Sequence, residues 1–390
     1  MKKIVTQGIK ESNRLNLVQE YYFSKKMKEI ASLTAAGQPV INMGIGSPDL
    51  FPSASVIDAL KISLVDASAH KYQSYQGLLE LRQAISDFYL KFFNVESNPI
   101  NEVLPLMGSK EGIMHISLAF LNPGDEVLIP NPGYPTYLSI TRLVEAKPIF
   151  YDLSKEDNWF PNLSDLEKLD LSKVKIMWIN YPHMPTGSSA NLYQLAKLVS
   201  FTKKHNILLI NDNPYSFILN NEFISLLSVQ GSKENCMELN SLSKSFNLSG
   251  WRVGMLLGSE NNISKVLQVK SNIDSGMFYG IQKGAIQALN LDENWFDNLN
   301  TIYRKRRKLI WELASILKCA FDEEAKGMFV WAKLPKGVNN SEKFIDSILI
   351  KKNVFIAPGA IFGSNGEGYI RFSLCIDEKK IKEAIKRWKQ

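Results

Sequence analysis

Cysteine and histidine are scarce in the 390-residue sequence, and this limits the kinds of site it can hold. The three cysteines, Cys236, Cys319 and Cys375, lie far apart, and none belongs to a C-x-x-C pair. We therefore expect neither a disulfide framework nor a cysteine-based zinc site. The 4 histidines form no H-E-x-x-H pattern, so we predict no metal site.

Long apolar runs and repeats are also missing. No stretch of about 18 apolar residues occurs, so we expect no membrane span. The N-terminal segment lacks the apolar stretch of a secretory signal, and we therefore expect a cytoplasmic protein.

No long block of one charge sign is present. The 46 basic and 39 acidic residues are interspersed, and short basic segments such as EKKIKEAIKRWKQ are typical of solvated helix faces. We therefore predict no nucleic-acid partner. The formal net charge of +7 suits small anionic substrates.

The middle of the chain alternates short β-branched apolar runs with longer helical segments. This order predicts βαβ units and a mostly parallel sheet, and runs that are apolar on both faces predict strands buried from both sides. The expected strands lie at 125–133, 147–153, 174–182, 206–214, 236–243 and 252–258, with helices at 109–121 and 191–205.

The pattern changes near residue 292, where 292–317 predicts one long amphipathic helix. Three short strands and a closing helix follow, which indicates a smaller α+β unit. We predict a large domain at 48–288, with 1–47 and 289–390 forming an N-terminal arm and the small C-terminal domain. The helical pattern near residues 19–33 fits either an exposed helix or an arm that packs on a partner.

Lys244 lies among small hydroxyl residues in the segment SLSKS, and Arg252 follows eight residues later. A single lysine is most often a solvated charge. Burial and nearby cations lower the pKa of a lysine amine and make it a nucleophile, most commonly for a Schiff base with a carbonyl group. A carbonyl cofactor such as pyridoxal phosphate also requires a phosphate cup, a carboxylate for the ring nitrogen and an aromatic partner.

A phosphate cup is indicated where an apolar strand gives way to a helix at Gly108-Ser109-Lys110. The free N–H groups of a helix N-terminus bind phosphate, although the same pattern also describes an ordinary helix cap. Further donors come from the lysine segment. They are Ser241, Ser243 and Arg252, of which the arginine can bind phosphate through two nitrogens.

Asp212 ends an apolar strand, at the edge where open α/β sheets bind their ligands. It could pair with a pyridinium N–H, Tyr215 could donate to the phenolic oxygen, and Tyr134 could stack on the ring. Turn formation and core packing are the ordinary alternatives. Arg371 lies inside an apolar strand, where it needs either a substrate carboxylate or an internal salt bridge.

In their order along the chain, these motifs resemble those of the class I/II aminotransferases, which are fold-type I pyridoxal-phosphate enzymes. The resemblance runs from NMGIGSPD to YIRFSL. The segments GSKEG, NPGYPTY and SNIDSGMF look most like a bacterial branch that includes LL-diaminopimelate and broad-range amino-acid aminotransferases.

The resemblance implies an α/β fold with a mostly parallel central sheet and a smaller α+β domain. It also implies pyridoxal 5'-phosphate as cofactor, Lys244 as the Schiff-base lysine and a homodimer in which Tyr72 reaches the partner's phosphate site. The implied cofactor-binding residues are Gly108, Ser109, Lys110, Tyr134, Asp212, Tyr215, Ser241, Ser243, Arg252 and Tyr72. The implied substrate-binding residues are Gly46, Asn180 and Arg371.

One motif departs from the family pattern N-Y-P-N-N-P-T-G. The chain has His183 and Met184 in place of the two consecutive asparagines. By resemblance, the second asparagine donates to the phenolic oxygen of the cofactor, and a thioether cannot donate. We expect either that Tyr215 supplies that bond alone or that His183 replaces the donor.

The reaction implied by the resemblance moves an amino group from an L-amino acid to a 2-oxo acid, with 2-oxoglutarate as the expected acceptor. A carbon–sulfur lyase on the same scaffold is the main alternative, because fold does not settle reaction. A cofactor-binding regulator would need an added DNA-binding domain. A nicotinamide-dependent dehydrogenase would need the third glycine of G-x-G-x-x-G, which GIGSPD lacks.

Overall fold

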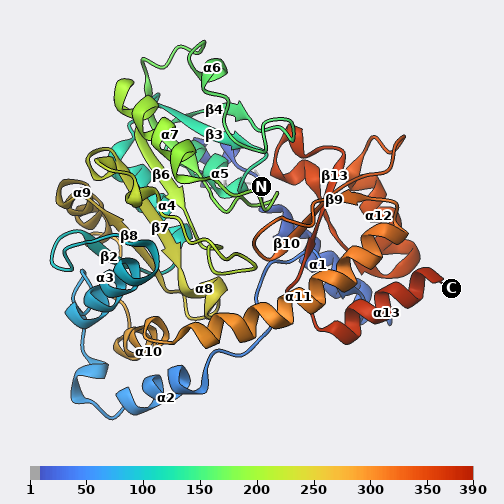
Figure 1. The fold of residues 1–390 in the computed structure, drawn as a ribbon, viewed down its shortest axis with the longest axis horizontal. Helices are drawn as coiled ribbons and strands as arrows, with labels where there is room; N and C mark the ends of the chain where they lie inside the picture. Colours follow the sequence, from blue (N-terminus) through green and yellow to red (C-terminus); the bar gives the residue numbers. More distant parts are fainter. Residues whose placement is uncertain (1–8, 390) are drawn as a thin grey trace, which may run out of the picture.

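A seven-stranded sheet forms the centre of the protein in the computed structural model, which describes residues 9–389 (Figure 1). The strand order is β2-β8-β7-β6-β5-β3-β4. Strand β8 is antiparallel to both of its neighbours, and the other pairs are parallel, which confirms the predicted mostly parallel α/β sheet. The strands are β2 (Val103–Leu106), β3 (Glu126–Asn131), β4 (Lys147–Asp152), β5 (Val174–Ile179), β6 (Leu208–Asp212), β7 (Cys236–Ser241) and β8 (Gly254–Gly258).

The central strands are largely buried and mostly apolar because helices cover both faces of the sheet. Successive residues of a strand point to opposite faces. Met177 and Leu209 belong to one apolar cluster, whereas Trp178 and Ile210 belong to another. The helices of this part are α2 (Ala54–Ser63), α3 (Leu79–Phe93), α4 (Ser109–Phe120), α5 (Pro135–Leu143), α6 (Leu163–Leu166), α7 (Leu192–Lys204), α8 (Leu242–Ser245), α9 (Glu260–Lys270) and α10 (Tyr279–Leu289).

A second unit begins with the 24-residue helix α11 (Glu293–Ile316), which runs from α10 toward the C-terminal elements (Figure 1). Its sheet has the order β12-β13-β10-β9, and β13 pairs antiparallel with β10 and with β12. The elements are β9 (Ala320–Phe321), β10 (Phe329–Lys333), α12 (Ser341–Lys352), β11 (Val354–Phe355), β12 (Ala357–Pro358), β13 (Tyr369–Ser373) and α13 (Glu378–Lys389).

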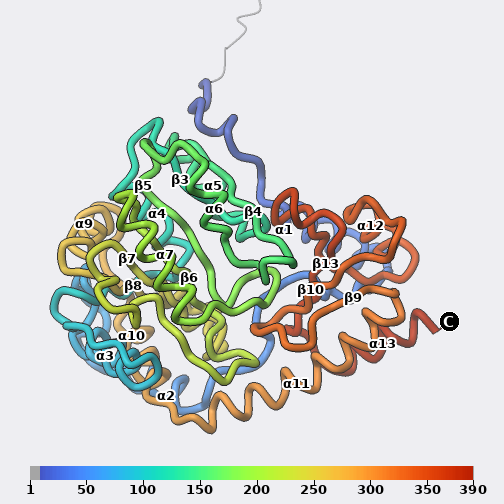
Figure 2. Tube along the Cα trace, turned by 45° about the horizontal axis from the view of Figure 1, so that its top comes forward, coloured from blue at the N-terminus to red at the C-terminus, as the bar shows by residue number. Residues whose placement is uncertain are grey.

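The N-terminal segment packs on this second unit of its own chain (Figure 2). Helix α1 (Tyr22–Ala35) places Phe23 and Ile30 in the apolar cluster of the C-terminal unit, and Lys26 Nζ lies 3.0 Å from Asp346 Oδ1 on α12. Strand β1 (Ile41–Asn42) pairs parallel with β11. These contacts support the proposed division into a large domain at 48–288 and a second unit formed by 1–47 together with 289–390. Residues 1–8 and 390 lie outside the part of the chain that the structure describes.

Short 3₁₀ turns complete the described chain. They span Asn13–Leu17, Ala67–His70, Leu226–Ser228, Ser232–Glu234, Gly359–Phe362 and Ser364–Gly366. Among residues 9–389, no helix combines the length and apolar character that crossing a membrane requires.

Candidate active site

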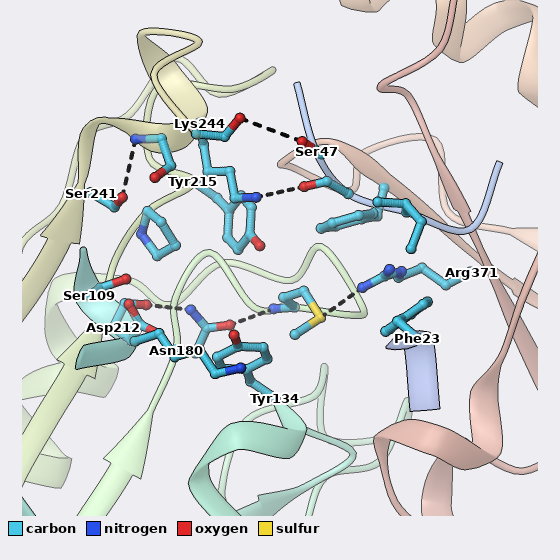
Figure 3. A pocket seen from close by; sticks show the side chains of 18 of the residues that line it. Phe23, Ser47, Ser109, Tyr134, Asn180, Asp212, Tyr215, Ser241, Lys244 and Arg371 are labelled. Carbon is cyan, nitrogen blue, oxygen red and sulfur yellow. Dashed lines mark hydrogen bonds between the residues drawn. The ribbon is translucent and has the colours of Figure 1, made fainter. Parts of the chain in front are cut away.

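A cavity of about 330 Å³ lies where the carboxyl ends of the central strands face the C-terminal unit (Figure 3). Most of the residues singled out in the sequence line it, although they come from segments far apart in the chain. They are Gly46, Ser109, Lys110, Tyr134, Asn180, Asp212, Tyr215, Ser241, Ser243, Lys244, Arg252 and Arg371.

Two predicted site residues do not line the cavity. Gly108 lies just behind it, and a Cβ there would come within 2.2 Å of Arg252 Nη2. With φ at +92°, the position also has a backbone conformation that favours glycine. Tyr72 is 91% exposed and lies outside the cavity of its own chain, so its role toward a partner stays a prediction.

Lys244 enters the cavity because β7 is followed at once by the one-turn helix α8. Ser241 caps this turn by accepting a hydrogen bond from the Ser243 N–H at 3.1 Å. The amine of Lys244 donates to the Gly46 carbonyl at 2.6 Å. Burial lowers the pKa of Lys244, and the nearby cations of Arg371 and Arg252 lower it further. Burial therefore shifts the amine toward its neutral, nucleophilic form, whereas Cys375 and Asp212 act in the opposite direction.

Asp212 lies at the end of β6 with one oxygen bonded and one without a partner. Its Oδ2 accepts a hydrogen bond from the Tyr137 hydroxyl at 3.0 Å, whereas Oδ1 is buried and has no hydrogen-bond partner among the described residues. Burial raises the pKa of Asp212 to about 7, against the opposing effects of Tyr137 and Lys244. A cationic N–H donor in the cavity would satisfy this carboxylate.

The raised pKa of Asp212 predicts that Asp212→Asn changes the stability of the cofactor-free protein in a pH-dependent way. A carboxyl group with a raised pKa in the folded state favours folding most at low pH, and this contribution is lost as the pH rises through about 7. This penalty starts above the ordinary pKa of 3.8 and is complete only above about 7, so we expect the stability gain of the variant over the wild type to be clearly larger at pH 8 than at pH 5.

Thermal midpoints measured from pH 5 to pH 8 test this expectation. Asp58→Asn is the matched control, because the Asp58 side chain is 60% exposed. Parallel midpoint profiles for the wild type and Asp212→Asn would contradict the assignment of an electrostatic penalty to Asp212.

The segment predicted to bind phosphate forms a cluster of donors at the start of α4. The first N–H groups of this 12-residue helix have no carbonyl partner within the helix, and no side chain caps them. Arg252 points to the same place from a left-handed backbone conformation, with φ at 56°. A Cβ at Gly254 would come within 2.7 Å of the Ser109 nitrogen, so glycine allows β8 to pass close to the cup.

Arg371 is buried in the cavity wall, and no carboxylate of residues 9–389 forms an ion pair with it. Its Nη2 donates to the Gly44 carbonyl at 2.8 Å and its Nη1 lies 3.2 Å from the Met184 sulfur, whereas its Nε has no partner. The guanidinium also lies 4.0 Å from the Phe329 ring centroid and 4.6 Å from that of Phe362. Burial lowers its pKa to about 10. A substrate carboxylate would supply the missing charge partner.

The two residues that depart from the family pattern, His183 and Met184, lie in different surroundings. His183 is buried outside the cavity lining, where its Nδ1 lies 2.7 Å from the Thr186 hydroxyl. It does not take the place of a donor in this structure, which leaves Tyr215 as the candidate phenol in the cavity. Met184 lines the cavity, and Asn180 fixes it by accepting its backbone N–H at 2.9 Å.

Sequence reasoning missed a residue that supports Asp212 from behind the cavity and several residues of the lining. Tyr137 was not singled out, although its ring stacks on Trp178 at 5.1 Å and its hydroxyl holds Asp212. The N-terminal arm adds Tyr21 and Phe23, for which the aromatic triplet YYF in a polar segment was the available signal. Further apolar lining residues are Ile45, Phe329 and Phe362.

A family assignment follows from comparison with known proteins. The family described as aminotransferase class I and II matches residues 38–387. The chain belongs to this family. It is therefore an aminotransferase, and the predicted resemblance is confirmed.

Individual relatives of this aminotransferase cover nearly its whole length. An LL-diaminopimelate aminotransferase of Dehalococcoides mccartyi is 38% identical over 379 residues, which is 97% of each chain. The LL-diaminopimelate aminotransferase of Nitratidesulfovibrio vulgaris is 36% identical over 381 residues, covering 97% of this chain and 98% of its own. The substrate-bound BacF structure from Bacillus subtilis superposes with a TM-score of 0.93 at 32% identity over 97% of both chains. These comparisons give no support to the alternative of a carbon–sulfur lyase.

Proposed function

We propose that this aminotransferase binds pyridoxal 5'-phosphate at Lys244 and moves an amino group from an L-amino acid to 2-oxoglutarate. One observation carries the proposal. The Lys244 amine, Asp212 Oδ1 and the Arg371 guanidinium all face one cavity, and within the described part of the chain Oδ1 has no hydrogen-bond partner and the guanidinium no counterion. These are the groups needed for an aldehyde, a ring nitrogen and an α-carboxylate, respectively.

The residues around the cavity fit this cofactor. Asp212 would bind its ring nitrogen, and the positive charge on that nitrogen would stabilise the ionised form of the buried carboxyl. The start of α4, together with Ser241, Ser243 and Arg252, would hold its phosphate. Tyr134 would pack on the ring and Tyr215 would donate to the phenolic oxygen.

When bound, the cofactor supplies an aldehyde for the amine and a ring that accepts the electrons of the Cα–H bond. Lys244 would also act as the general base that accepts the Cα proton of the substrate, because its amine faces the cavity. Its lowered pKa suits this role, because a neutral amine is needed to accept a proton. The Gly46 carbonyl orients the amine through the hydrogen bond at 2.6 Å.

Arg371 fixes the substrate rather than moving protons. Two nitrogens of a guanidinium match the two oxygens of a carboxylate, and its Nε is the unpartnered donor. Phe329 and Phe362 pack on the guanidinium and keep water from it, which strengthens the pairing. The same contact would hold the amino acid and the 2-oxo acid in turn.

Borohydride trapping tests the proposal. Protein incubated with pyridoxal 5'-phosphate should gain visible absorbance, and reduction should fix one cofactor on the peptide that contains Lys244. Peptide mass mapping identifies the residue that carries the cofactor. Lys110 lies in the same cavity and is the internal control, so an adduct at Lys110, or no adduct at all, would contradict the proposal.

The homodimer with shared sites and the cytoplasmic location stay predictions from the sequence. The exposure of Tyr72 supports a role toward a second subunit. The names of the relatives make LL-diaminopimelate a candidate amino donor.

A further inference from the structure

We propose that Glu111, His115 and Asp274 bind a divalent metal ion, and that zinc is the ion their donor atoms fit best. Glu111 and His115 lie one turn apart on α4, and Asp274 lies in the segment that follows α9. One ligand atom of each residue lies within 4.8 Å of the ligand atoms of the other two. This goes against the expectation from the sequence, which has no H-E-x-x-H pattern, because only the fold brings Asp274 to α4.

His115 is a buried imidazole whose two ring nitrogens are unpartnered. Its side chain is 1% exposed, and neither Nδ1 nor Nε2 has a hydrogen-bond partner within residues 9–389. The chain's own atoms already cover both nitrogens, so a second subunit cannot supply the missing partner. Burying an imidazole in this way is costly unless an ion or a water lies beside it.

The distance between His115 and Glu111 fits a shared metal ion better than a direct hydrogen bond. His115 Nε2 lies 3.5 Å from Glu111 Oε1, whereas N–H···O hydrogen bonds measure about 2.7–3.2 Å. Zinc binds nitrogen and carboxylate oxygen at about 2.0–2.2 Å in tetrahedral geometry, which places neighbouring ligand atoms roughly 3.3–3.6 Å apart. Glu111 Oε2 accepts the Met107 N–H at 2.9 Å, so Oε1 is the oxygen left for the ion.

Asp274 also has one occupied and one free oxygen. Its Oδ1 accepts hydrogen bonds from Lys270 Nζ at 2.9 Å and from the Gly276 N–H at 2.8 Å. Its Oδ2 is buried and has no partner among the described residues. The two bonds to Oδ1 fix the orientation of the carboxylate, as the outer partners of metal ligands commonly do. Asp274 can therefore offer Oδ2 to an ion while it keeps both of these contacts.

The charges around the cluster favour a cation. Lys270 and Asp274 form an ion pair in which both side chains are at most 5% exposed. Lys270 is held at Oδ1 and at the Tyr75 carbonyl, at 2.8 Å, so it leaves Oδ2 available. Glu111 pairs with no lysine or arginine of the described chain, and one negative charge thus remains. Zinc accepts one imidazole, two carboxylates and a water, and it would link α4 to the segment after α9.

Zinc retention by the full-length protein tests the proposal. The protein is treated with EDTA, dialysed, incubated with zinc sulfate and dialysed again. We expect one zinc per chain by elemental analysis, and a thermal midpoint about 3 °C or more above that of the EDTA-treated protein when zinc is in large excess over its Kd. A protein that retains no zinc would overturn the proposal and would mean that the cluster holds a water or a proton only.

Glu111→Gln is the most conservative variant, because its amide oxygen can still accept the Met107 N–H. We expect it to weaken zinc binding at least about tenfold in calorimetric titrations, and His115→Gln to do the same. His205→Gln is the matched control, because His205 Nε2 lies 3.1 Å from Glu167 Oε2 in a pair that is not buried. Unchanged affinity in Glu111→Gln, or a loss confined to His205→Gln, would overturn the proposal.

X-ray absorption at the zinc edge gives a readout on the wild-type protein, so it does not depend on whether a variant folds. The spectrum should show one imidazole together with oxygen ligands at about 2.0–2.2 Å. A sulfur ligand at about 2.3 Å would place the ion at Cys236, Cys319 or Cys375 and would overturn the proposal. None of the three proposed ligands lines the cavity of the candidate active site, so the result is independent of the proposed function.

Discussion

Lys244→Ala should lower kcat for transamination by about 10⁴-fold or more, because the variant lacks the amine that we propose both to bond the cofactor and to move the Cα proton. Within the described chain, the cavity lining contains two lysines, Lys244 and Lys110. The Nζ atom of Lys110 lies 4.8 Å from the centroid of the Tyr21 ring. Formation of the 2-oxo acid product from an amino donor measures the loss.

Lys110→Ala is the matched control for this experiment. It removes a lysine from the same cavity but from the phosphate cup, so it should weaken cofactor affinity and keep turnover at saturating cofactor. Circular dichroism and the thermal midpoint establish that both variants are folded. Activity of Lys244→Ala near the wild-type level would show that another group moves the proton.

Arg371→Met should lower kcat/KM for the amino donor by about 10²- to 10⁴-fold, because each hydrogen bond to a charged group contributes about 1.5–3 kcal/mol. Most of the loss should appear in KM, since the proposed contact of the guanidinium with the α-carboxylate is the same before and after proton transfer. Arg371→Lys keeps the charge but loses the planar pair of donors, and we expect an intermediate loss. Initial rates over a range of donor concentrations separate KM from kcat.

Thermal stability distinguishes a substrate clamp from a structural arginine. In the absence of ligand, Arg371 is a buried cation that forms no ion pair within residues 9–389, so the methionine variant should be at least as stable as the wild type. Hexanoate should raise the thermal midpoint of the wild type alone. A large loss of stability in ligand-free Arg371→Met would mean that the residue mainly holds the two units together.

The sequence predicted the central sheet well because its strands are buried on both faces. Runs such as 174–182 and 206–214 are apolar without alternation, which excludes a solvent-exposed face, and the structure places β5 and β6 there. The polar residue that ends each run could be assigned to the site, because parallel strands bring their carboxyl ends to one edge. Asp212 is the clearest example.

The parts that could not be predicted depend on tertiary contacts. Tyr137 holds Asp212 from a different helix, and nothing in the segment PTYLSITRL distinguishes its hydroxyl from that of any buried tyrosine. The contact of Met184 with Arg371 joins residues 187 positions apart in the chain. The packing of α1 was open for the same reason, since an amphipathic helix does not specify which surface covers its apolar face.

The placement of α1 separates the determinants of reaction from those of selectivity. Lys244, Asp212 and the phosphate cup belong to the central sheet and its loops, whereas Phe23 reaches the cavity from a helix anchored on α12. Mutations in the arm can therefore change which donors are accepted and leave every diagnostic motif intact. Homologues with identical motifs could diverge in metabolic role through substitutions in α1 alone. Classifying such homologues by their motifs would not detect that divergence.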